Sequence, residues 1–245
     1  MRLILLLSLL VSACASAKNF TLCYEEWPPY ALRSDEEDKG LVINQLLTAA
    51  SHLSWQVNFI DLPHNRCVKG VKSGKFDGAL FVDESDGLNL LQPSIAEWRL
   101  GFLVKSDHPA QTSSDIFHGL MIMALDYEYP EILIAKLNKL PLVRKRVTYY
   151  TTNDLDTKGL FNYIHKHSAD VMLIDEVWAQ LTIKRMKLKL RMLSPPLHVE
   201  PQYLGVAANQ SKSVIAALED LITQSQTTAQ NKNTESAETL AKKRD

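Results

Sequence analysis

Trp27-Pro28-Pro29-Tyr30 stands between a strand-like run, 20–24, and an apolar, helix-like run, 41–53. Two consecutive prolines can neither donate backbone hydrogen bonds nor continue a strand, so the chain must stop pairing here and turn. The turn leaves two large aromatic side chains, Trp27 and Tyr30, at the carboxyl end of a first strand. In open α/β sheets this is the edge at which ligands bind. Both are therefore candidate ligand-binding residues, and the alternative is that they pack between helix and sheet.

Strand-like and helix-like segments alternate outward from this turn. The first group is expected as strand 20–24, helix 41–53, strand 55–62, helix 65–73 and strand 78–82. The second group is expected as strand 120–125, helix 129–140, strand 147–150, helix 156–167, strand 170–174 and a helix from 176. This order predicts an α/β fold with parallel strands and right-handed crossovers in two groups.

Two extended segments connect the groups and set the expected domain boundaries. Residues 98–104 lead from the first group to the second, and strand 203–208 returns before a last helix, 214–223. Lobe one is therefore predicted at 18–103 plus 201–223, and lobe two at 104–200. Residues 224–245 are polar with almost nothing to bury, which predicts a disordered tail.

The N-terminus has the pattern of a secretion signal, predicted at residues 1–17. Met1-Arg2 is a basic start, 3–11 is an apolar run and Ala15-Ser16-Ala17 is a small-residue cleavage site. The apolar run is too short to span a bilayer. The alternative is lipoprotein processing at Cys14, but strand-like sequence follows almost at once and leaves no tether. The expected location is the periplasm.

The composition and the cysteines indicate what kind of protein this is. A formal net charge of -1 and 46% hydrophobic residues describe an ordinary globular chain with no sign of nucleic-acid binding. The basic run 184–191 is interpreted as a solvated face. Signal cleavage leaves Cys23 and Cys67, and an even pair in an oxidising compartment predicts a disulfide. The alternative, a catalytic Cys67 thiol near His64, is disfavoured beside a second cysteine.

No catalytic or cofactor motif is present. The sequence contains no HExxH, P-loop, dinucleotide-binding glycine turn or G-x-S-x-G. His165 and His167 are two residues apart and would lie on different sides of a helix. We therefore expect no catalytic residues, no bound metal and no cofactor.

Several segments in this order resemble a known family. They are Trp27–Tyr30, Gly40–Leu41, Val71–Gly78, Phe102–Lys105 and Ala169–Asp175. The chain is similar to type 2 periplasmic solute-binding proteins of family 3, which serve amino acid ABC importers. The resemblance implies two α/β lobes joined by two crossover strands, with a solute held in the cleft between the lobes.

Two departures from the family pattern concern the ligand. The family clamps the ligand carboxylate with an arginine in a turn after strand three, where this chain has Asp83-Glu84-Ser85-Asp86. The family also has a Gly-Ser/Thr turn in lobe two, where this chain has 126–129, Asp-Tyr-Glu-Tyr. The chain therefore resembles a divergent branch, and an ordinary α-amino acid is not indicated.

Further candidate site residues follow strand ends or match family positions. In the resembling family the position of Asp175 often receives a ligand amino group, and the alternative is a helix N-cap. Arg99 is a candidate for a carboxylate or phosphate contact, with a surface salt bridge as the alternative. The predicted ligand-binding set is Glu26, Trp27, Tyr30, Asp83, Asp126, Tyr127, Asp175 and Arg99. Glu25 and Glu128 adjoin members of this set in the sequence and are further candidates. Several carboxylates converging on a cleft would favour a cation or amine.

The sequence predicts a non-catalytic, monomeric periplasmic receptor for a small polar, amine- or amino-acid-like solute. Its partners would be that solute and either ABC importer subunits or a sensor. The alternative is a lyase or dehydratase of small carboxylic acids, because the resembling fold also hosts a dehydratase of cyclohexadienyl acids. That chemistry needs a proton donor beside a carboxylate clamp, and the usual clamp arginine is missing.

Overall fold

A computed structural model describes residues 18–33, 35–116, 121–124, 129–140, 147–150, 161, 164 and 170–242. The predicted signal peptide and Cys14 lie outside the described residues. Across those residues no helix is both long enough and apolar enough to cross a membrane.

The chain forms two compact units. The first unit holds residues up to Glu26, then Ala31–Pro93 and the chain from Leu204, while the second holds Trp27–Tyr30 and Ser94–Tyr203. The second unit thus begins before residue 104, because the extended segment after Pro93 pairs with strands of that unit. The return to the first unit lies after Tyr203, and the Trp27–Tyr30 turn was not expected in the second unit.

The first unit is built on three parallel strands. β1 (Asn19–Tyr24) lies between β2 (Gln56–Asp61) and β3 (Gly78–Val82), and each neighbour runs parallel to it. α1 (Leu41–His52) and α2 (His64–Lys72) are the intervening helices. The predicted alternation of strands and helices is confirmed here. η2 (Glu84–Asp86) and the two-residue β4 (Asn89–Leu90), which were not expected, complete the unit with the end of β10.

Helix α1 shows why this part of the chain is helical. Its buried side chains recur three and four residues apart, which places them on one face. That face packs toward α6 (Lys212–Lys242), whose Leu218 and Leu221 are fully buried. The chain enters α1 through Gly40, whose φ of 91° is a conformation that a residue with a Cβ rarely adopts.

The predicted disulfide is confirmed. Cys23 in β1 and Cys67 in α2 are bonded, with their Cα atoms 5.6 Å apart, and both are buried. The bond joins the central strand of the first unit to a helix that covers it. The alternative of a free Cys67 thiol is thereby excluded.

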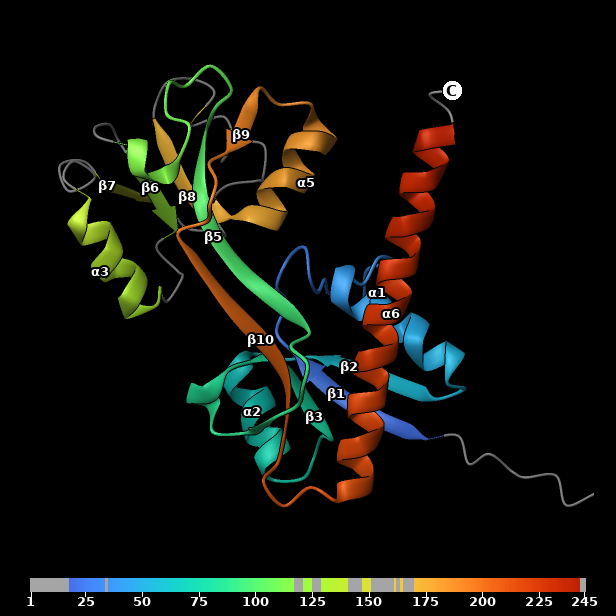
Figure 1. Cartoon of the computed structure of the whole chain (residues 1–245). Coiled ribbons are helices and arrows are strands. Elements are labelled where there is room, and N and C mark those ends of the chain that lie inside the picture. The colour runs from blue at the N-terminus through green and yellow to red at the C-terminus, as the bar shows by residue number, and fades with distance from the viewer. Residues whose placement is uncertain are drawn as a thin grey trace, which may run out of the picture. The chain divides into compact units, whose positions relative to one another are not determined.

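The predicted disordered tail is wrong over most of its length. α6 continues past residue 223 to Lys242 and forms a long helix in Figure 1. Ser225 is buried and donates to the carbonyl of Ile222, so packing extends beyond residue 223. A helix that is already nucleated gains one hydrogen bond per added residue, and the following residues include many good helix formers.

The second unit combines parallel and antiparallel strands. β6 (Met121–Ala124) pairs in parallel with β7 (Val147–Tyr150) and β8 (Val171–Asp175). β5 (Ala96–Lys105) runs antiparallel to β8, to β9 (Leu190–Met192) and to β10 (His198–Val206). The helices given in full by the described residues of this unit are η3 (Ser113–Asp115), α3 (Glu131–Lys139) and α5 (Glu176–Met186). Of the predicted helix 156–167 only Phe161 and Ile164 are described.

The sheet of the second unit is covered on both faces (Figure 1). Phe102 and Leu173 pack in a cluster with side chains of α3, whereas their neighbours Leu103 and Met172 pack in a cluster with Ala179 of α5. Successive side chains of a strand point to opposite faces, so a strand covered on both faces needs a continuous apolar run. This explains the uninterrupted pattern that predicted β8.

The basic run 184–191 spans the end of α5 and the start of β9. Lys184, Arg185, Lys187 and Lys189 are exposed, in keeping with a solvated face. Arg191 instead donates to backbone carbonyls, among them that of His108 at 2.8 Å.

Candidate functional site

The Trp27–Tyr30 segment forms the predicted turn. The Tyr30 backbone N–H donates to the carbonyl of Trp27 at 2.8 Å, and the peptide bond between Pro28 and Pro29 is cis. The two aromatic rings lie against each other with centroids 4.3 Å apart. Trp27 is half-buried, whereas Tyr30 is only 5% exposed.

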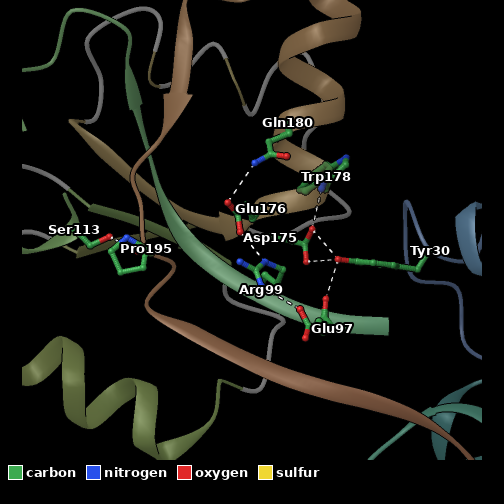
Figure 2. Close-up of polar contacts among 9 residues, drawn as sticks. All are labelled: Tyr30, Glu97, Arg99, Ser113, Asp175, Glu176, Trp178, Gln180 and Pro195. Carbon is green, nitrogen blue, oxygen red and sulfur yellow. Dashed lines mark hydrogen bonds and ion pairs between the residues drawn. The ribbon is translucent and has the colours of Figure 1, made fainter. Parts of the chain in front are cut away.

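The Tyr30 hydroxyl lies among three acceptor atoms of the second unit (Figure 2). It is 3.1 Å from the backbone carbonyl oxygen of Glu97 and 3.1 Å from Asp175 Oδ2. Asp175 Oδ1 is slightly farther away, at 3.4 Å. A hydroxyl has one proton, so these acceptors share a single donor.

Asp175 is the last residue of β8 and the N-cap of α5. Its Oδ1 accepts from the Trp178 backbone N–H at 2.8 Å, as an N-cap side chain does. The residue is only 2% exposed. The alternative of a helix N-cap is therefore observed, while an amine-binding role stays a prediction.

The environment of Asp175 changes its proton affinity. Burial raises the pKa of Asp175 to about 6, against the opposing effect of hydrogen bonds from Trp178 and Tyr30. Burial and the neighbouring Asp175 carboxylate raise the pKa of the Tyr30 hydroxyl as well, so this hydroxyl keeps its proton. At neutral pH the pair is thus a buried carboxylate that accepts from a neutral phenol.

We expect this buried charge to make stability depend on pH. Because the pKa of Asp175 is higher in the folded than in the unfolded chain, the native state binds the proton more tightly. The contribution of Asp175 should therefore be most favourable below about pH 4 and be lost as pH rises through about 6. We expect the free energy of unfolding of the wild type, relative to Asp175→Asn, to fall by about 2–3 kcal/mol between pH 4 and pH 7.

Urea unfolding of both proteins at a series of pH values measures this difference. The Asn side chain keeps a carbonyl oxygen for the helix cap, so the fold is retained. A constant difference between the two proteins across this range would contradict the raised pKa.

Arg99 is held by two carboxylates. Its Nε donates to Glu176 Oε2 at 2.8 Å and its Nη1 to Glu97 Oε2 at 3.0 Å. These contacts raise the pKa of Arg99 and keep it charged. Gln180 Nε2 in turn donates to Glu176 Oε1 at 3.2 Å. The salt-bridge alternative for Arg99 is thus observed, although its partners were not predicted.

The remaining predicted residues lie elsewhere. Glu25 and Glu26 are exposed residues of the first unit, and partial desolvation of the Glu26 carboxyl together with the neighbouring Asp61 carboxylate raises the pKa of Glu26. Asp83, also in the first unit, caps η2 by accepting from the Ser85 backbone N–H at 2.7 Å. The other predicted site positions, Asp126, Tyr127 and Glu128, lie outside the described residues.

Sequence reasoning missed Glu97 and Glu176. Glu97 contributes a backbone carbonyl oxygen as well as its carboxylate, and the identity of a side chain carries no information about a carbonyl contact. Glu176 could have been noted, because an acidic residue in the first turn of a helix directly after Asp175 adds a second carboxylate there. Arg99 and Glu97 are two apart on β5, so they share a face, which was a further signal.

The resulting arrangement is an acceptor-rich cluster. Glu97, Asp175 and Glu176 contribute three carboxylates, against the single guanidinium of Arg99. Within the described parts of the chain no group of His, Cys, Asp and Glu side chains could hold a metal ion. Chemically, such a cluster suits a hydrogen-bond donor with positive charge.

Among the comparisons with known proteins, the solved structures bear on the fold. No protein-family profile matches the sequence, and no curated protein sequence does. Among solved structures, substrate-binding domain 2 of GlnP from Lactococcus lactis in an open conformation matches with a TM-score of 0.68 at 15% identity, over 89% of this chain and 94% of that chain.

Two further structures extend the range of roles among similar folds. The L-cystine solute receptor of Neisseria gonorrhoeae matches with a TM-score of 0.60 at 17% identity, over 84% of this chain and 86% of that chain. A histidine kinase sensor domain matches with a TM-score of 0.59 at 15% identity, over 90% and 96% respectively. The chain thus has the α/β fold of the substrate-binding proteins of amino acid ABC transporters, as its sequence pattern predicts.

Proposed function

We propose that this protein is an exported, non-catalytic receptor that binds a small amine-bearing solute outside the cytoplasm. The observation that carries the proposal is the buried Asp175 carboxylate beside the Trp27–Tyr30 turn. Among the described residues its hydrogen-bond donors are neutral, namely backbone N–H groups and the Tyr30 hydroxyl. A buried carboxylate without a cationic partner is costly, and an ammonium group would supply that partner.

The charge balance favours a cation over an anion. Arg99 is the cationic side chain of this cluster, and its guanidinium already binds Glu97 and Glu176. An anionic solute would have to compete with both carboxylates for Arg99 and would be repelled by Asp175. A cationic solute does not need the Arg99 guanidinium as a partner, and complementary charge also speeds its association.

The aromatic pair supports the same proposal. Trp27 is half-buried and its ring lies against Tyr30, whose hydroxyl contacts the Asp175 carboxylate. Aromatic faces attract ammonium groups electrostatically, by about 0.5–2 kcal/mol. An aromatic pair in contact with Asp175 through Tyr30 would add to the attraction of an amine to this carboxylate.

The similar structures suggest the partners of such a receptor. They include the substrate-binding protein of an amino acid ABC transporter and a sensor domain of a histidine kinase. We propose that this protein delivers its solute to an importer or presents its liganded form to a sensor. The expectation that two lobes enclose the solute stays a prediction.

A series of solutes matched in length tests the proposal. Cadaverine, δ-aminovalerate and glutarate share a five-carbon chain and exchange amines for carboxylates one at a time. We expect the melting temperature of the protein to rise with cadaverine, to rise less with δ-aminovalerate and to stay unchanged with glutarate, because only a bound solute stabilises the native state. Shorter and longer series, and tyramine with its carboxylate analogue, cover other shapes.

The same series contains its own controls. Neutral alcohols of equal length separate the effect of charge from that of chain length. Stabilisation by the dicarboxylates rather than the amines, or by none of the compounds, would contradict the proposal. Chemical conversion of a bound compound, followed by NMR, would instead support the lyase alternative.

A further inference from the structure

The Tyr30 hydroxyl occupies a position with the properties of an amine subsite. Its oxygen is 3.1 Å from the Glu97 carbonyl oxygen, 3.1 Å from Asp175 Oδ2 and 3.4 Å from Asp175 Oδ1 (Figure 2). Three acceptors thus surround one atom that has a single proton to donate. An ammonium nitrogen at the same point would have three protons for the same three acceptors.

We propose that the Tyr30 hydroxyl is an internal competitor that holds the amine subsite at Asp175 and Glu97 until a solute ammonium displaces it. The inference rests on the proposed function and adds to it the position of the amine nitrogen and the residue that opposes its binding. Tyr30 thereby lowers the affinity of a solute by the free energy of the hydroxyl contacts that the solute must replace.

The energetics of the two donors favour the exchange. The hydroxyl is neutral and donates one proton, whereas an ammonium donates up to three and forms an ion pair with the Asp175 carboxylate, in which donor and acceptor are both charged. An ammonium also compensates the charge of the buried Asp175 carboxylate, which the hydroxyl cannot do. A neutral alcohol or amide has neither advantage, so the competition also selects for charge.

The position of Tyr30 in the chain suits a displaceable group. It is the last residue of the Trp27–Tyr30 turn, and the chain leaves the second unit directly after it. Its hydroxyl contacts are with residues far away in the sequence, Glu97 and Asp175. Movement of this short turn would therefore free the acceptors without disturbing β8 or α5, since the cap bond from Trp178 to Asp175 does not involve Tyr30.

Removal of the hydroxyl tests the competition. In Tyr30→Phe the ring remains, but the internal donor is absent. We expect this variant to bind cadaverine and tyramine about threefold to tenfold more tightly than the wild type, as measured by calorimetry, because the hydrogen bonds of the competing hydroxyl are lost. The affinity for glutarate should not increase.

Tyr24→Phe is a matched control. Tyr24 is equally buried, and its hydroxyl donates to a backbone carbonyl, that of Leu32, at 2.7 Å within the first unit. Its removal deletes a comparable tyrosine hydrogen bond away from Asp175. We expect Tyr24→Phe to lose stability but to bind both amines as the wild type does.

The possible outcomes separate this inference from the proposed function. Tighter amine binding by Tyr30→Phe, including binding seen only in that variant, supports both. Equal or weaker amine binding by Tyr30→Phe, with the wild type binding, overturns the competition and leaves the receptor proposal standing. Absence of amine binding by the wild type and both variants overturns both. If Tyr30→Phe is too unstable at room temperature, the three proteins are compared at low temperature, and failure of Tyr30→Phe to bind more tightly than the wild type there counts against the competition.

Discussion

Loss of the Cys23–Cys67 disulfide is expected to destabilise the first unit by about 3–4 kcal/mol. The bond closes a segment with a sequence separation of 44 residues, so it removes much conformational freedom from the unfolded chain. Both residues are buried, and the bond joins β1 to α2. In a protein of this size the change corresponds to a fall in melting temperature of roughly 10 °C.

The measurement compares urea unfolding of the wild type with that of a Cys23→Ala/Cys67→Ala variant. Alanine avoids placing a new polar group in the core. The fluorescence of Trp55, which packs against Phe20 of β1, reports on the first unit, whereas Trp98 and Trp178 belong to the second. Single-tryptophan versions therefore show which unit loses stability.

A reducing agent supplies the control for the disulfide. It should destabilise the wild type by a similar amount and leave the double variant unchanged. An equal response of the two proteins, or a double variant as stable as the oxidised wild type, would contradict the expected role of the bond.

The second large effect is expected from Asp175→Asn on amine binding. One charge-assisted hydrogen bond contributes roughly 1.5–3 kcal/mol, so the affinity for cadaverine should fall by about 10-fold to 150-fold. Asparagine is also a good N-cap and has nearly the same shape. The loss should therefore reflect the missing charge rather than a damaged α5.

The pH dependence of binding gives an independent signature of the same residue. Because burial raises the pKa of Asp175 to about 6, the carboxylate is ionised at neutral pH and becomes protonated below that value. The affinity of the wild type for amines should fall as pH decreases through about 6. Asp175→Asn should show no such fall, as calorimetry between pH 5 and pH 8 can establish.

Asp115→Asn is the matched control for Asp175. Asp115 also lies in the second unit and accepts hydrogen bonds from backbone N–H groups, including that of Thr112, but it is exposed. Its substitution removes one carboxylate of the same unit without touching the candidate site. A similar loss of affinity in both variants would indicate a general charge effect and would contradict a specific role of Asp175.

The sequence by itself determined most of the local structure. The continuous apolar run 78–82 and the apolar run of β8 predicted strands buried on both faces, and the helical periodicity of 41–53 predicted α1. The double proline predicted the turn at Tyr30, and the cysteine pair predicted the disulfide. The predictions of strands, helix and turn are correct because backbone restrictions and the burial of one face are encoded within a short window of sequence.

Only the tertiary structure decided where the site lies and where the last helix ends. Tyr30 and Asp175 are 145 residues apart, and nothing in either local pattern indicates that the Tyr30 hydroxyl donates to Asp175. The Glu97 acceptor is a backbone carbonyl, which every residue possesses, so no residue type could reveal it. α6 continues past residue 223 because its earlier turns pack and nucleate it, although its polar composition predicted disorder. Contacts between distant segments thus determine the candidate site, and the packing of the first turns of α6 allows the polar residues after 223 to continue the helix.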